Sequence, residues 1–168
     1  IGGLVGYNSG TMDHISAEGD AVAYTDMENM PSDSLFHYRV SAPSGSYVGG
    51  IAGETTAAVS DISIKGAYVR GKTYTGGITG HIALSVASKN IIVGENGCPV
   101  YIVGSNYTSG IGYQNRGDSN NSTFATVEDS TVQYTYISGG TNTAGVLSAG
   151  SWYATIKRTI VDKCFIKG

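Results

Sequence analysis

One stretch of the chain gathers the residue types that act on glycosidic bonds. It contains Arg116, Asp118, Glu128 and Asp129. Two carboxyl groups roughly 5 to 9 Å apart across such a bond can hydrolyse it. Neighbouring side chains on an extended strand point to opposite faces, so Glu128 and Asp129 cannot both face one groove if that stretch is extended. The sequence therefore predicts no catalytic residues, and a carbohydrate-active enzyme, either a polysaccharide lyase or a hydrolase, is the alternative.

The polar segment 116–122 is the first candidate for ligand binding. Arg116-Gly117-Asp118 is a tripeptide that integrins recognise in other proteins. Asp118 and Asn120 carry oxygen ligands of the type that calcium prefers, but their spacing is not that of an EF-hand loop. Loops on a rigid scaffold are common places for function. We predict Arg116, Asp118 and Asn120 as binding residues in a solvated loop.

The three histidines do not form a metal site by their pattern. A zinc peptidase needs H-E-x-x-H on a helix, and the sequence contains neither this motif nor a long amphipathic helical pattern. His14, His37 and His81 are therefore interpreted as ordinary strand or loop residues. The sequence predicts no metal and no cofactor.

Tyrosines provide a second candidate binding surface. Tyr47, Tyr74 and Tyr107 stand two or three residues before a glycine that recurs along the chain. An outward aromatic row at a corner can stack on sugar rings or on a partner protein. Packing of the rings across the corner is the competing interpretation. We predict Tyr74 and Tyr107 as binding residues and leave this alternative open.

A repeated structure must position these side chains, because the chain repeats one segment. Residues 67–78, 100–111 and 135–146 share a plan in which an aromatic residue precedes a glycine by nine positions. A looser copy covers 38–51, and a fourth opening stands at 164–168. Regular repetition at this scale predicts one structural unit stacked on itself.

The shortest copy predicts the geometry of one coil. Residues 50–53, 60–64 and 67–70 would form three strands, and 60–64 alternates apolar and polar residues as a half-buried strand does. Stacking the coils produces one aliphatic column and one aromatic core column. The aliphatic column is Leu4, Ile51, Ile78, Ile111 and Val146, and the aromatic column is Tyr68, Tyr101, Tyr136 and Phe165. We predict an all-β, right-handed parallel β-helix, or β-solenoid, of about five coils with variable loops.

Residues 1–168 form a single solenoid segment in this interpretation. The chain opens within a repeat and closes on the start of another, without the polar caps that solenoids need, so we expect a fragment of a longer repeat protein. Residues 1–38 hold six acidic residues and no basic one, whereas residues 151–168 hold four basic residues and one acidic residue. The two ends of such a rod would differ in sign, which permits head-to-tail contact, although further repeats of the same chain are the expected neighbours.

Three segments bounded by glycine share a pattern. They are Gly3-Leu4-Val5-Gly6, Gly50-Ile51-Ala52-Gly53 and Gly77-Ile78-Thr79-Gly80. They resemble the GLUG repeat of bacterial surface and secreted proteins, which occurs in adhesin-like proteins and beside the catalytic region of immunoglobulin A1 metallopeptidases. The fourth and fifth copies depart from the pattern, as Gly110-Ile111-Gly112-Tyr113 and Gly145-Val146-Leu147-Ser148. The resemblance implies a bacterial, cell-surface or secreted β-solenoid.

Composition limits the classes of partner. The net charge of −3 does not favour nucleic acid, whose partners are basic, and no apolar run approaches the ~20 residues of a membrane span. We predict a non-catalytic structural or adhesive module whose partner is a host protein, a glycan or neighbouring repeats of the same chain. Ice binding is a third possibility, since Thr73-Tyr74-Thr75 and Thr141-Asn142-Thr143 match the Thr-x-Thr rows of ice-binding solenoids.

Overall fold

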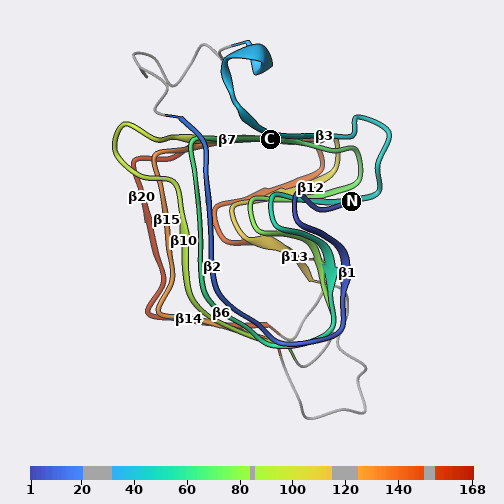
Figure 1. The fold of residues 1–168 in the computed structure, drawn as a ribbon, viewed down its shortest axis with the longest axis vertical. Helices are drawn as coiled ribbons and strands as arrows, with labels where there is room; N and C mark the ends of the chain where they lie inside the picture. The colour runs from blue at the N-terminus through green and yellow to red at the C-terminus, as the bar shows by residue number, and fades with distance from the viewer. Residues whose placement is uncertain (21–31, 84–85, 115–124, 150–153) are drawn as a thin grey trace.

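In the computed structural model, parallel strands stack into five successive coils around one apolar core (Figure 1). The structure describes residues 1–20, 32–83, 86–114, 125–149 and 154–168. Equivalent strands of successive coils pair in parallel, which confirms the predicted all-β parallel β-helix. The prediction of three strands per coil was wrong by one, because the described strands form four sheets, named I to IV here in the order in which the chain enters them. None of the helices in the described residues is long and apolar enough to cross a membrane.

Sheet I lies on the right of Figure 1 and opens each coil. Its strands in spatial order are β1 (Val5–Asn8), β5 (Ala52–Thr55), β9 (Thr79–Ile82), β13 (Gly112–Gln114) and β18 (Leu147–Ala149). The strand predicted at 50–53 begins instead at Ala52. The second glycine of the repeat is required for steric reasons. At Gly80, a Cβ would lie 2.3 Å from the backbone nitrogen of Val48. Strand β9 thus packs backbone to backbone against the neighbouring coil, which only glycine permits.

Sheet II lies on the left of Figure 1 and holds seven strands. They are β2 (Met12–Glu18), β6 (Val59–Lys65), β10 (Ala87–Val93), β14 (Ala125–Glu128), β15 (Thr131–Gln133), β19 (Ala154–Lys157) and β20 (Ile160–Asp162). Each coil bends this sheet at one residue with positive φ. These residues are His14, Asp61, Asn90, Asp129 and Arg158. Asp, Asn and His adopt the left-handed region more often than most residues, which suits four of the five positions.

Sheet III crosses the top of Figure 1. Its strands are β3 (Tyr38–Ser41), β7 (Ala67–Arg70), β11 (Val100–Val103), β16 (Thr135–Ser138) and β21 (Phe165–Lys167). The strand predicted at 67–70 is confirmed. The predicted aromatic column is also present, since the Tyr101 and Tyr136 rings lie 5.7 Å apart and the Tyr136 and Phe165 rings 5.2 Å apart.

The aromatic column is buried, as predicted, but it forms a core cluster of its own on the outer face of sheet III. Val100 and Ile102 belong to the main core, and Tyr101 between them belongs to a separate aromatic cluster. Alternation along a strand requires this, because neighbouring side chains point to opposite faces. The short 3-10 helix η1 (Asp33–Leu35) lies outside sheet III (Figure 1). The ring of Phe36, the residue that follows η1, lies 5.1 Å from the Tyr101 ring.

The looser copy at 38–51 enters the stack one residue away from the predicted alignment. Arg39, and not Tyr38, pairs with Tyr68 of the next coil. The Tyr38 hydroxyl instead donates a hydrogen bond to the carbonyl oxygen of Gly50 at 2.6 Å. The ring that covers Tyr68 comes from Phe36, at 5.8 Å, so the first aromatic position is filled from outside the strand.

Sheet IV occupies the part of each coil that was predicted to be a corner without strands. Its strands are β4 (Tyr47–Gly49), β8 (Tyr74–Gly76), β12 (Tyr107–Ser109) and β17 (Asn142–Ala144). The Thr75 and Thr108 side chains are fully buried, so these two threonines of the Thr-x-Thr pattern that suggested ice binding lie inside the coil.

The predicted aliphatic column is present. Its successive members are joined by backbone hydrogen bonds, and Ile51, Ile78 and Ile111 are buried.

Candidate functional site: the tyrosine corner

The outer faces of sheets IV and I meet at an inward-pointing corner in the outline of the coil (Figure 1). Strands β4, β8 and β12 pair in register and place Tyr47, Tyr74 and Tyr107 in one row. The Tyr47 and Tyr74 rings stack at 5.1 Å, and the Tyr74 and Tyr107 rings stack at 5.2 Å. Because Val48, Thr75 and Thr108 point into the core, alternation directs these tyrosines outward.

Sheet I contributes a second row to the corner. Tyr113 pairs with His81 in register, and its ring lies 4.1 Å from that of Tyr74 and 4.9 Å from that of Tyr107. The His81 ring lies 5.2 Å from the Tyr47 ring. We call these five residues the tyrosine corner. Burial, together with the neighbouring Tyr74 and Tyr107, raises the pKa of Tyr113 to about 12, so its phenol is neutral at ordinary pH.

A carboxylate borders the tyrosine corner. Glu54 precedes His81 in the same column of sheet I, and its Oε1 lies 3.0 Å from the His81 Nδ1. His81 is only 8% exposed, and its Nε2 has no hydrogen-bond partner among the described residues. The corner therefore combines apolar ring surface with a carboxylate and an imidazole nitrogen, as ligand sites commonly do.

Mutual stacking restricts what each predicted tyrosine can offer. Tyr74 carries Tyr47 on one face and Tyr107 on the other, so its ring edge and hydroxyl are what a ligand could contact. Tyr107 is partly buried in the same row. Open ring surface is larger at the first coils, where Tyr47 is 40% exposed and Tyr7, next to Glu54 in its column, is 59% exposed.

Sequence reasoning missed Tyr113, His81, Glu54 and Tyr7 as members of one surface. The fourth coil is one residue shorter than the third between its first glycine and sheet I, so Gly112 stands opposite Gly80 and Tyr113 opposite His81. Matching the repeats by their first glycine sets Tyr113 against Gly80 instead. The signal that could have found the shift is Gly112 itself, a glycine one position early in the fourth copy.

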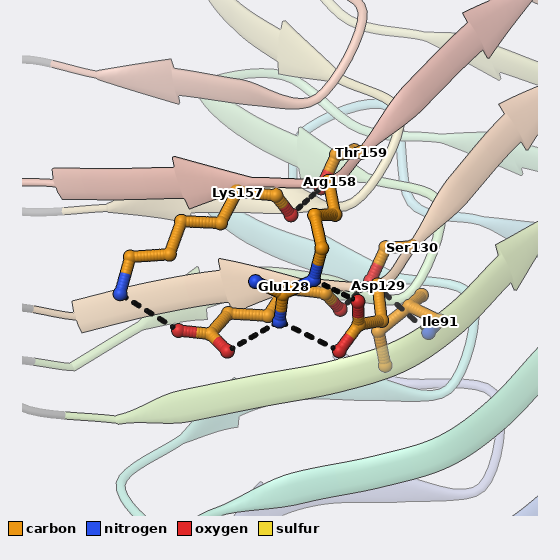
Figure 2. Close-up of polar contacts among 7 residues, drawn as sticks. All are labelled: Ile91, Glu128, Asp129, Ser130, Lys157, Arg158 and Thr159. Atoms are coloured by element: carbon orange, nitrogen blue, oxygen red, sulfur yellow. Dashed lines mark hydrogen bonds and ion pairs between the residues drawn. The ribbon is translucent and has the colours of Figure 1, made fainter.

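The acidic pair singled out for glycosidic chemistry is engaged in ion pairs (Figure 2). Asp129 has a φ of 51°, so the stretch is not extended there, and Glu128 and Asp129 both approach the Arg158 guanidinium. Arg158 donates to Asp129 Oδ1 at 2.5 Å and to Glu128 Oε2 at 3.2 Å. Lys157 donates to Glu128 Oε1 at 3.2 Å. The hydrogen bond from Arg158 lowers the pKa of Asp129, which favours the ionised form of that carboxyl group.

Two further groups of polar residues are candidates for binding. The predicted binding residues Arg116, Asp118 and Asn120 lie outside the described residues. Among the described residues, ligand atoms of Asp13, His14 and Asp61 lie within 4.8 Å of one another, at exposed positions of sheet II that could hold a metal ion.

Comparisons with known proteins add no relative to this description, because no family model, curated protein or solved structure matches the chain. The class of protein follows from the fold alone. Five coils of parallel strands stacked in sequence order, with inner aliphatic and outer aromatic columns, make it a parallel β-helix of the solenoid type.

Proposed function

We propose that this chain is a non-catalytic structural and interaction module, a rigid β-solenoid that presents the tyrosine corner to a partner. The observation that carries the proposal is the corner itself, where tyrosines from two sheets gather beside Glu54 on an uninterrupted stack of strands. Tyrosine is enriched at binding surfaces because its ring is rigid and its hydroxyl can pair with a polar partner. The tyrosines are placed by paired strands and not by a loop, which keeps the surface preorganised.

The GLUG-like segments support a bacterial, cell-surface or secreted setting and an adhesive role within it. In that setting the partner is a host protein, a glycan or neighbouring repeats of the same chain. The charge of −3 speaks against nucleic acid. Arg116, Asp118 and Asn120 remain proposed contacts in addition to Tyr74 and Tyr107 of the tyrosine corner.

The ion pairs of Glu128 and Asp129 speak against the catalytic alternative. A general acid and a nucleophile must reach the substrate, whereas Glu128 and Asp129 share Arg158, and Lys157 occupies the remaining oxygen of Glu128. Incubation with a panel of polysaccharides tests this directly. Turnover that disappears in Glu128→Gln would establish an enzyme and overturn the proposal.

The test of binding uses a glycan array and a panel of host surface proteins, with folding checked by circular dichroism. Tyr7→Ala and Tyr47→Ala remove the most exposed rings of the surface and should abolish or strongly weaken capture. Ile92→Ala, which removes a comparably exposed apolar side chain from sheet II, is the matched control and should bind normally. Asp118→Ala tests the polar segment separately. Capture that survives the tyrosine changes and Asp118→Ala alike would refute both proposed contact surfaces.

A further inference from the structure

Three tyrosines of the tyrosine corner contact one another in a triangle. They are Tyr74 on β8, Tyr107 on β12 and Tyr113 on β13. The ring centroids of Tyr74 and Tyr113 lie 4.1 Å apart, closer than the other two pairs at 5.2 Å and 4.9 Å. Each of the three strands is paired on both sides with strands of neighbouring coils, so the triangle lies within the stack and not at its ends.

The hydroxyl ends of Tyr74 and Tyr113 also meet. Burial is the largest cause of the raised pKa of Tyr113, and a hydrogen bond with the Tyr74 side chain adds to it. The Cε atoms, which flank the hydroxyl carbon of each ring, are therefore brought near each other in this pair. Tyr74 and Tyr107 instead stack face to face, with 23° between their planes, so the spacing of the strands separates their Cε atoms.

Tyrosine rings in such contact can be joined by oxidation. A haem peroxidase that uses hydrogen peroxide takes one electron from a phenol, and the phenol releases its hydroxyl proton. Two phenoxyl radicals then pair their electrons in a new bond between one Cε of each ring. The hydrogen on each joined carbon leaves as a proton and a proton returns to each oxygen, which restores both phenols. In sum, two phenols and one hydrogen peroxide yield one dityrosine and two molecules of water.

We propose that Tyr74 and Tyr113 are an oxidative cross-linking site, at which hydrogen peroxide and a haem peroxidase join two coils of the solenoid by a dityrosine bond. A fixed contact favours the coupling of two radicals, because the reacting atoms do not have to find each other by diffusion. Tyr74 and Tyr107 are partly exposed, so an oxidant can take an electron from them, and the ring contacts connect them to the buried Tyr113. This inference does not rest on what the tyrosine corner binds.

The bond would tie together parts of the stack that are distant in the chain. Strand β8 ends the second coil and β13 begins the fourth, so the link spans the whole third coil. A covalent link of this kind restricts the unfolded chain and thereby stabilises the folded one, as a disulfide does. It would also hold the two rows of the tyrosine corner in a fixed relation.

Peptide mapping by mass spectrometry tests the proposal with the full 168-residue chain, treated with hydrogen peroxide and a haem peroxidase and then digested with trypsin. Tyr74 is the only tyrosine of the tryptic peptide 73–89, and Tyr113 lies in the peptide 90–116. The expected product is this pair of peptides, joined with the loss of two hydrogen atoms and with fragments that place the bond on Tyr113. Absence of the product, or a bond formed mainly between Tyr74 and Tyr107, overturns the proposal.

Two variants that keep the rings in place serve as matched tests, with folding checked by circular dichroism. Tyr113→Phe should abolish the product, because phenylalanine has no hydroxyl hydrogen to lose. Tyr107→Phe, from the same triangle, should retain most of it. An equal mixture of unlabelled and isotopically labelled chains should give peptide pairs in which both peptides carry the same isotope. Mixed pairs at the frequency of random pairing would show that the bond forms between chains and would overturn the proposal.

Stability provides a second readout. The urea midpoint of the purified cross-linked monomer should be higher than that of the untreated chain. Tyr113→Phe, treated in the same way, should keep the midpoint of its untreated form. An unchanged midpoint in the cross-linked parent, or an equal increase in Tyr113→Phe, would overturn the link between coils.

Discussion

The hydroxyl oxygen of Thr108 lies against the backbone of Gly104, at 2.2 Å from the place where a Cβ on that glycine would stand. The relationship recurs in the stack, with Thr75 facing Gly71 and Thr143 facing Gly139. Gly104 lies between β11 of sheet III and β12 of sheet IV. The threonine hydroxyls in this column have no hydrogen-bond partner among the described residues.

Replacing Thr108 by Val should leave stability unchanged or raise it. The buried Oγ1 of Thr108 is unpaired, so an apolar group of the same shape removes a desolvation cost of about 1–3 kcal/mol. Val48 already occupies the same column of sheet IV. The urea midpoint measures the change. Thr135→Val is the matched control, because the Thr135 hydroxyl donates to the Gln133 carbonyl at 2.7 Å and its loss should lower the midpoint.

Replacing Gly104 by Ala should destabilise the protein. The new methyl group would meet Thr108 Oγ1 and Thr75 Oγ1, and overpacking of a closed site costs about 1–3 kcal/mol. Gly10→Ala serves as the control, since a Cβ there meets nothing within 4 Å. Thermal unfolding of the two variants compares them directly. An equal Tm for Gly104→Ala and the parent chain would show that the sheets can separate at this point without cost.

Phe36 should contribute more to stability than its position outside the strands suggests. It is buried against Tyr68 and Tyr101, and truncating a buried Phe to Ala costs about 3–5 kcal/mol. Leu35→Ala, at an exposed neighbouring position, should change stability by less than about 0.5 kcal/mol. Chemical denaturation of both variants measures the difference. Similar effects of the two changes would mean that Phe36 adds little to the stability of the aromatic cluster.

Tyr113 should make stability fall at alkaline pH. Its pKa in the folded chain is raised to about 12 from an ordinary value of 10, so the unfolded chain loses this proton first. The contribution is complete below pH 10 and is lost as pH rises toward 12. Tyr113→Phe removes this part of the alkaline loss. Ultraviolet titration of the phenols and urea midpoints between pH 9 and 12 test the effect, and identical pH profiles would contradict it.

Much of the architecture could be predicted because the repeat has a physical cause. Parallel strands stacked in register require like residues at like positions, so the columns containing Ile51 and Tyr101 were visible as sequence periodicity. Strand 67–70 could be placed to the residue for the same reason. Sheet IV was missed because its strands span three residues each, too few for alternation to register as a pattern.

The candidate site depended on details that repetition hides. One residue absent from the fourth copy moved Tyr113 beside His81, and a single left-handed residue at Asp129 turned Glu128 and Asp129 toward one arginine. Register and backbone handedness are set by contacts between coils, so no local window of sequence contains them.

By itself the sequence determined that this chain stacks coils of parallel strands, because its glycines, aliphatic residues and aromatic residues recur at spacings that stacked coils bury together. Only the tertiary structure decided which face each column occupies. The tyrosines of sheet III form a separate buried cluster on its outer face, where Phe36 covers Tyr68 and Tyr101, and those of sheet IV meet Tyr113 at a corner between two sheets. The physical reason is that side chains alternate between the two faces of a strand, so both faces show the same period of two in the sequence. Only the packing of a neighbouring element determines which face is buried.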